Sequence, residues 1–206
     1  MTKADWSGSR ACYRMIMSAD GPSASPSLTG GTAVWVFMAV ELVTFALFLG
    51  GFAWSWRSDA TAFASGQATL HPASGLRGTV LLLVGSGLAY AATGAYAEQA
   101  RRRAAAMLLA TAACGGAFAV NKALEYADPS LVGVTLSSSP FWFNYLFLTG
   151  LHLLHVLLGV AALPWVAWRV SVGAADRLTV EAIAAYWHLV DVVWLLLFPM
   201  IYLVHP

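Results

Sequence analysis

Six ionisable side chains lie within or at the end of long apolar runs of this sequence, where a charge is costly and therefore usually has a function. Two pairs share one spacing, because His152 and His155 are three residues apart and so are His188 and Asp191. Residues at i and i+3 lie on the same face of a helix. The six candidate residues are Glu41, Glu125, His152, His155, His188 and Asp191.

Three kinds of chemistry are compatible with the two histidine-containing faces, which can meet near the middle of a membrane. The first is a buried hydrogen-bonded clamp between helices, for example a histidine donating to Asp191. The second is a proton relay. The third is a haem or metal site, since imidazole is a common ligand. A pair of His152 and His188 is conceivable for one haem, but no second pair is present. The sequence favours the clamp and leaves the other two open.

Two carboxyl groups need separate interpretation. Glu41 lies nine residues into its run, about 13 Å from the start of a helix, so it must be protonated or paired. Its nearest basic residue in the sequence, Arg57, is about 24 Å away on a straight helix. We therefore expect Glu41 to be protonated and either proton-linked or hydrogen-bonded to a neighbouring helix or lipid. Glu125 follows Lys122 by three residues, which predicts a local ion pair at the membrane interface.

The elements that position these residues follow from composition. Hydrophobic residues make up 59% of the 206, and charged residues make up 10%. This indicates an integral membrane protein, and the net charge of +1 argues against nucleic-acid binding. We predict an all-α bundle of five transmembrane helices in a domain over 31–206, after a flexible polar arm over 1–30. The spans are predicted at about 32–56, 76–96, 104–124, 141–168 and 180–204. We also predict that two rows of small residues lie at helix contacts, namely Gly87, Ala91 and Ala95, and Ala106, Ala110 and Cys114.

The last two spans resemble subunit III of haem–copper respiratory oxidases. The matching segments are LTGLHLLHVLLGV and EAIAAYWHLVDVVWLLLFPMIYL. Weaker matches are ELVTFALFLGGF around Glu41, LHPASG without the family's second proline, and KALEY at Glu125 and Tyr126. The resemblance extends from about Val34 to Leu203. The family usually has seven helices, and this chain lacks the first two, which puts the family's lipid cleft in doubt.

The resemblance implies a non-catalytic accessory subunit without catalytic, cofactor-binding or metal-binding residues of its own. Haem and copper are then expected in partner subunits, and the implied partners are the catalytic subunit of a haem–copper superfamily enzyme and phospholipid. GLHLLHVLLG, VWVF before Glu41 and the ending LFPMIYLV resemble five-helix members associated with bacterial nitric oxide reductase, hence with denitrification. Subunit III of a cytochrome c or quinol terminal oxidase is the alternative. A stand-alone b-haem or proton-relay protein is the alternative of another class.

The distribution of Lys and Arg predicts the orientation in a bacterial inner membrane. Eight of the eleven lie on the side of the N-terminus, the loop at 98–103 and the loop at 169–177. By the positive-inside rule, the N-terminus is cytoplasmic and the C-terminus periplasmic. Reporter fusions at both ends test this prediction. Cytoplasmic reporter activity at the C-terminus would show that the number of spans is wrong.

Overall fold

The computed structural model describes residues 31–203, with side chains from residue 34 onward. The predicted arm over 1–30 and residues 204–206 lie outside this part of the chain. The described residues contain no strand, and five of their helices are long and apolar enough to cross a membrane. This confirms the predicted all-α architecture with five spans. The five are α2 (Gly31–Ser58), α4 (Pro72–Ala97), α5 (Arg101–Tyr126), α6 (Pro140–Ser171) and α7 (Arg177–Tyr202).

Local signals set the helix ends. Helices α4 and α6 both begin at a proline, whose fixed φ suits the first helical position and whose missing N–H would have no partner there. Helix α4 therefore starts four residues before the predicted Leu76. Asp176 accepts a hydrogen bond from the backbone N–H of Thr179 at 2.9 Å and caps α7. The 32 residues of α6 make it about 48 Å long, which exceeds a hydrocarbon core as expected.

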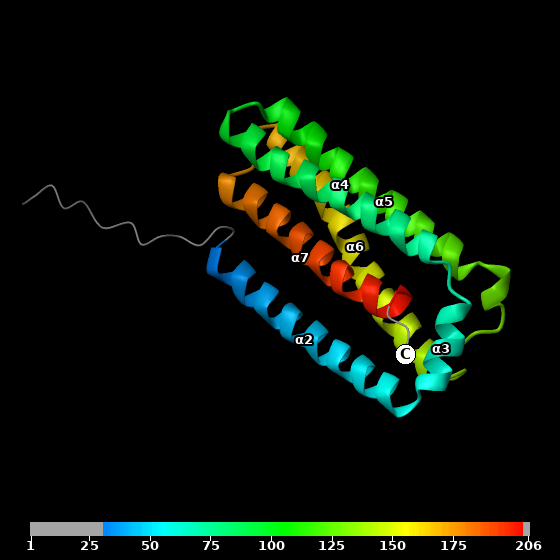
Figure 1. The fold of residues 1–206 in the computed structure, drawn as a ribbon. Helices are drawn as coiled ribbons and strands as arrows, with labels where there is room; N and C mark the ends of the chain where they lie inside the picture. The colour runs from blue at the N-terminus through cyan, green and yellow to red at the C-terminus, as the bar shows by residue number, and fades with distance from the viewer. Residues whose placement is uncertain (1–30, 204–206) are drawn as a thin grey trace, which may run out of the picture.

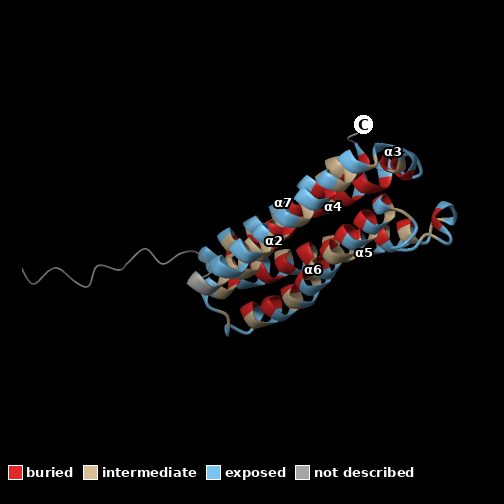
Figure 2. Ribbon diagram, turned by 90° about the horizontal axis from the view of Figure 1, so that it is seen from below, coloured by how far each residue is buried: buried red, intermediate tan, exposed pale blue. Residues whose placement is uncertain are grey.

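The bundle has a packed centre and a loosely attached outer helix. Helices α4 and α5 form an antiparallel hairpin, α7 packs against α4 and α6, and α6 packs against α5 (Figure 1). Helix α2 lies at the opposite edge and contacts α7 and α6. Buried residues line the inner faces of the helices, whereas α2 is largely exposed (Figure 2). Within the described chain, α2 is therefore the span with the most surface left for lipid or a partner.

A short helix that the sequence analysis does not predict, α3 (Ala60–Ala68), closes one end of the bundle. Asp59 caps its first turn by accepting from the N–H of Ala62 at 3.1 Å. Its Phe63 is fully buried between Phe52 and Phe141, at ring distances of 5.3 and 5.5 Å. The Nε2 group of Gln67 donates to the carbonyls of residues 200 and 201 in the last turn of α7. Such carbonyls have no partner within a helix, so α3 caps α7.

The predicted small-residue rows are correct at one end only, since Ala95 is buried and Cys114 lies beside Gly85 of α4. Gly87 is exposed, and an added Cβ there would meet nothing within 4 Å. Ala106 is exposed as well, although Ala95 is buried. The small residues of α4 that do face the bundle are Gly75, Gly78, Gly85, Ala89, Ala92 and Ala95. A spacing of four residues occurs on several faces of such a helix, so it does not by itself select the packed one.

One indole fills the space where four helices meet. Trp187 of α7 is fully buried. An added Cβ would lie 3.2 Å from its Nε1 at Gly85, 2.5 Å from its Cη2 at Gly115, and 3.1 Å from its Cε3 at Gly159. These glycines belong to α4, α5 and α6 respectively. The absence of three side chains therefore creates the cavity that the ring occupies.

Because of this packing, two neighbouring glycines of α5 should differ in how well they tolerate substitution by alanine. We expect Gly115→Ala to lower the free energy of unfolding by about 1–3 kcal/mol, the usual cost of overpacking a core, because Val160 also stands 2.6 Å from the new methyl group. Gly116→Ala is the matched control, since nothing lies within 4 Å of its Cβ position. Unfolding in mixed micelles of increasing SDS content measures both. Equal effects of the two substitutions would contradict the packing described above.

Candidate functional site

The six predicted residues fall into separate clusters rather than one clamp. Glu41 and His155 join α2 to α6, while His188 and Asp191 face α4. His152 is enclosed alone between α6 and α7, and Glu125 lies at the end of the bundle closed by α3. The last two spans do meet through hydrogen bonds, since His152 binds the carbonyl of Val190 and Tyr186 donates to the carbonyl of His155. Within the described residues, however, no histidine donates to Asp191.

Glu41 has a partner that its own helix could not provide. Its Oε2 lies 3.3 Å from Nε2 of His155, and both side chains are mostly buried, at 20% and 13% exposed. Phe45 covers the imidazole at a ring distance of 5.5 Å. The pair is the polar contact that attaches the outer helix α2 to α6.

The second nitrogen of His155 restricts where protons can be. Nδ1 lies 2.8 Å from the carbonyl oxygen of Leu151, which can only accept, so Nδ1 carries a hydrogen. Nε2 then either accepts from a protonated Glu41 or donates to an ionised Glu41 from an imidazolium. The pair has no net charge in either arrangement. Protonation of Glu41 at neutral pH stays a prediction, but the polar side chain that it faces, His155, is now identified.

The contacts of His152 are those of a histidine that stabilises the packing of helices. It is completely buried, and its Nε2 lies 3.1 Å from the carbonyl of Val190 on α7. Trp194 and Phe118 enclose its ring at 5.0 and 5.5 Å. Its Nδ1 has no hydrogen-bond partner in the described part of the chain. Because the carbonyl requires a hydrogen on Nε2, the neutral ring leaves Nδ1 as a bare acceptor.

His188 and Asp191 approach the same hydroxyl group of α4. Nδ1 of His188 lies 2.6 Å from Oγ of Ser86, and Asp191, one turn further along α7, lies near this hydroxyl without a hydrogen bond to it. Asp191 is 4% exposed, and neither of its carboxyl oxygens has a hydrogen bond of normal geometry within residues 31–203. The suggested donation from a histidine of α6 to Asp191 is therefore corrected. The sequence analysis did not single out Ser86, since serine is common in membrane helices.

The predicted ion pair of Lys122 and Glu125 is confirmed, with Nζ 2.8 Å from Oε1, and it is enclosed by the bundle rather than exposed on its surface. Both side chains are buried, at 1% and 4% exposed. Lys122 also donates to the hydroxyls of Tyr202, at 2.7 Å, and Tyr145, at 3.3 Å. Ser74 donates to Oε2 of Glu125 at 2.6 Å. The pair therefore joins α4, α5, α6 and α7.

The hydroxyl groups of Tyr145 and Tyr202 supply the remaining hydrogen bonds to the carboxylate of Glu125. Both hydroxyls donate to Oε1, that of Tyr145 at 2.5 Å and that of Tyr202 through a short contact. The Nζ of Lys122 also lies 4.7 Å from the ring centre of Tyr145. A buried ion pair is tolerated only with such additional bonds. These partners are distant in the sequence, so the spacing of Lys122 and Glu125 could not reveal them.

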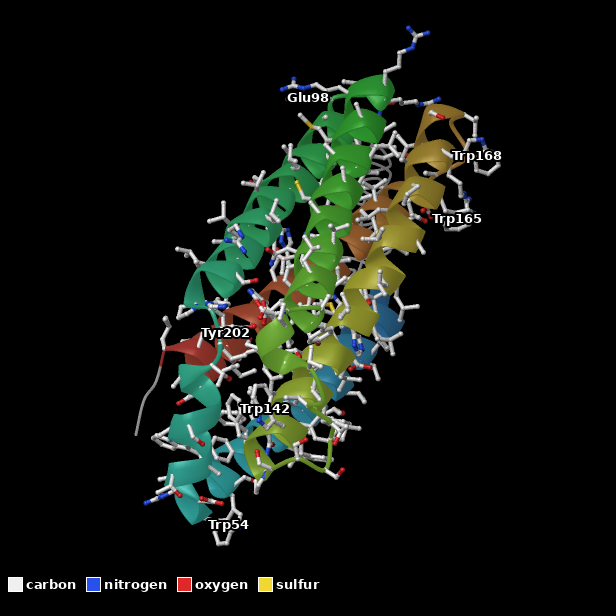
Figure 3. All side chains as sticks on the ribbon, turned by 90° about the vertical axis from the view of Figure 1, so that its right-hand side faces the viewer. Trp54, Glu98, Trp142, Trp165, Trp168 and Tyr202 are labelled. Atoms are coloured by element: carbon white, nitrogen blue, oxygen red, sulfur yellow. The ribbon has the colours of Figure 1, made fainter. Side chains whose placement is uncertain are left out.

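The clusters lie at defined depths between two ends of the bundle. Trp165, Trp168 and Glu98 mark one end, and Trp54 marks the other, with Trp142 and Tyr202 on its side (Figure 3). Tryptophans near both ends of the bundle are typical of residues at the two membrane surfaces. Within residues 31–203, no three His, Cys, Asp or Glu side chains are arranged to hold a metal ion. The groups present can hold, share and pass protons.

These features define a multi-pass helical membrane protein whose buried polar groups connect its helices. The family model described as cytochrome c oxidase subunit III matches residues 32–205. The chain therefore belongs to the cytochrome c oxidase subunit III family. This confirms the family part of the resemblance.

Curated relatives show how the chain compares in extent. It is 30% identical to the heme-copper oxidase subunit I+III of Aeropyrum pernix over 182 residues, which cover 84% of this chain and 22% of that protein. It is 37% identical to cytochrome c oxidase subunit 3 of Corynebacterium diphtheriae over 93 residues, 44% of this chain and 45% of that one. It is 29% identical to cytochrome c oxidase subunit 3 of Hippopotamus amphibius over 181 residues, which cover 80% of this chain and 67% of that protein. The chain thus spans less than half of the first two relatives.

The buried ion pair is open to a direct test. We expect Lys122→Met to lower the free energy of unfolding by about 3–5 kcal/mol, because it leaves Glu125 buried without its cation. Adding Glu125→Gln should recover much of this loss. Arg177→Met is the matched control, since Arg177 forms a similar pair with Glu181 but is 76% exposed, and should cost less than about 1 kcal/mol. SDS unfolding measures all three, and no recovery in the double variant would contradict this assignment.

Proposed function

We propose that this protein is a non-catalytic accessory subunit of a haem–copper superfamily respiratory complex and that it supports assembly and stability of the catalytic subunit. The observation that carries the proposal is the extent of the family match, residues 32–205. It includes all five membrane-spanning helices. The described chain thus consists of the subunit III bundle with short connections.

The hydrogen bonds of the histidines support a role without haem. Nε2 of His152 is bound to a backbone carbonyl, and both ring nitrogens of His155 have partners. Nδ1 of His188 is bound to Ser86. The conceivable haem pair, His152 with His188, would have to give up these bonds. We therefore favour structural and proton-linked roles over the b-haem alternative.

The identity of the partner enzyme belongs to the proposal. The sequence features around Glu41 and His155 favour the five-helix members associated with bacterial nitric oxide reductase. Relatives that are subunits of cytochrome c oxidases favour the alternative of an oxygen-reducing terminal oxidase. The two share the architecture described above. The partner's haem composition therefore distinguishes them more directly than this chain does.

A phospholipid is the second proposed partner. A groove of ≈ 400 Å³ separates the first half of α2 from α6 and α7, and its lining is apolar. Trp165 lines it, and Arg169 stacks on that indole with its guanidinium 5.1 Å from the ring. An acyl chain fits the apolar lining, and the Arg169 cation is available to a phosphate at the membrane surface. We propose the groove as a lipid site on this basis.

Co-purification tests the proposed function. An affinity tag on this chain in native bacterial membranes should recover a haem-containing catalytic subunit, whereas the purified single chain should show neither haem nor copper. Asp191→Asn and His188→Ala should reduce the amount of assembled complex more than the turnover of each assembled complex. Stoichiometric haem in the single chain would favour the electron-carrier alternative. Recovery of the chain without any haem protein from solubilised membranes would overturn the proposal.

A further inference from the structure

A cavity between the end of α4 and the start of α7 leads along α7 towards a buried carboxyl group. The cavity has a volume of ≈ 350 Å³, is open along its outer side, where Tyr90 is exposed, and is lined by residues that include Gly94, Arg177, Glu181 and His188. Its mouth is at the end of the bundle that carries Arg101, Arg102 and Arg103, where Arg177 donates to Glu181 at 2.5 Å. His188 is about 16 Å along α7 from that mouth. The cavity therefore reaches from the surface towards the middle of the membrane.

Asp191 lies one turn beyond His188 and is not balanced by any cation nearby. It is 4% exposed, and its oxygens lack regular hydrogen bonds within the described chain. Arg177 is about 21 Å away along α7, and Lys122 is bound to Glu125. An ionised carboxylate in such a place is strongly destabilised. Asp191 must therefore hold a proton, or bind another cation, to exist in this fold.

Ser86 connects Asp191 to the cavity. Its hydroxyl has one hydrogen and is 2.6 Å from Nδ1 of His188, so it can donate to the histidine or to Asp191 but not to both. Because Nδ1 is bound to Ser86, the other ring nitrogen of His188 is left for the cavity that the residue lines. The three groups form a short chain in which every member can both give and receive a proton.

We propose that Asp191 is a proton-binding site loaded from the Arg177 end of the bundle through the cavity, His188 and Ser86. A proton from water in the cavity binds Nε2 of His188. The proton on Nδ1 then moves to Ser86 as the Ser86 hydroxyl proton moves to the Asp191 carboxylate. His188 ends neutral with its hydrogen on Nε2, Ser86 keeps one hydrogen, and Asp191 is protonated. Reversal of these steps releases the proton to the same side.

The described residues form no chain of proton-passing groups from the opposite end of the bundle to Asp191. The next polar contact along α7 is the donation from Trp194 Nε1 to Thr79 at 3.0 Å. An indole N–H can donate but cannot accept, so it does not pass a proton onward. Val193, which lies between Asp191 and Trp194 in the chain, is buried, and so is Leu82, which lies between Thr79 and Ser86 on α4. The arrangement is a one-sided proton site and not a channel.

Other titratable groups near this site are engaged or more distant. On α7 itself these groups are His188, Glu181 and Arg177, and on α4 Tyr90 lines the cavity. On α5, Cys114 stands beside Gly85, and on α6, His152 binds the carbonyl of Val190. On α2, Glu41 is paired with His155. Glu41 is the other deep carboxyl group of the described chain. Any assignment of a titration to Asp191 must therefore be separated from Glu41.

Infrared difference spectroscopy of the full chain in lipid vesicles tests the proposal. Across the pH range in which the chain stays folded, a carboxyl C=O band should appear as pH falls. Asp191→Asn, which preserves the shape of the side chain, should abolish this band, and Glu41→Gln should leave it. Persistence of the full set of titrating bands in Asp191→Asn would overturn the proposal. A midpoint that moves with sodium concentration would overturn it in favour of a metal cation.

The route is tested by blocking the cavity. An added Cβ at Gly94 meets nothing within 4 Å, so Gly94→Phe can be accommodated while narrowing the cavity that Gly94 lines. It should slow hydrogen–deuterium exchange of the Asp191 carboxyl group, and Ser86→Ala should do the same. Gly87→Phe is the matched control, because Gly87 lies on the same helix with equal space and outside the cavity lining. Equal exchange rates in all four proteins would reject the proposed route.

Discussion

The packing of Trp187 into a cavity made by three glycines is the constraint on which the rest of this bundle depends. Gly85, Gly115 and Gly159 come from three different helices, and each lacks the Cβ that would collide with the ring. Lipid provides no hydrophobic force between helices, so close contact of this kind must hold them together. A shift of any one helix along its axis would replace a glycine with a side chain. The indole therefore fixes the relative heights of α4, α5, α6 and α7.

That register determines which polar groups can meet. Two turns of α7 beyond Trp187, Trp194 donates to Thr79 of α4, and two turns further Tyr202 reaches Lys122 and Glu125. One residue beyond Trp187, His188 meets Ser86. All of these contacts lie on α7 and need its height to be correct within a fraction of a turn. The apolar packing thus positions the hydrogen bonds, and the hydrogen bonds make an incorrect register costly.

The comparison between sequence and structure follows from the same geometry. Hydropathy and length were sufficient for the five spans, because a membrane leaves helices as the default. The i,i+3 spacing was sufficient for the Lys122–Glu125 pair, because both partners lie on one helix. It could not identify the partner of His155, since the choice of Glu41 depends on the rotation of α2 about its axis. For the same reason Gly87 was assigned to a packed face although it is exposed. Helix α3 has no periodic hydrophobic pattern, because its one large apolar side chain is that of Phe63.

Depth in the membrane explains why the carboxyl groups are treated differently. Glu125 lies in the last turn of α5, close to a membrane surface, and four donors including a lysine satisfy it as a full charge. Glu41 and Asp191 lie deeper, where their partners are a histidine and a serine. A histidine beside a carboxyl group can share one proton with it and leave no net charge, whichever of them holds the proton. Such a pair can change its proton distribution without placing an unbalanced charge in hydrocarbon. A carboxyl group linked to histidine through a hydroxyl, as at Asp191, needs only a route to water to become a site that fills and empties.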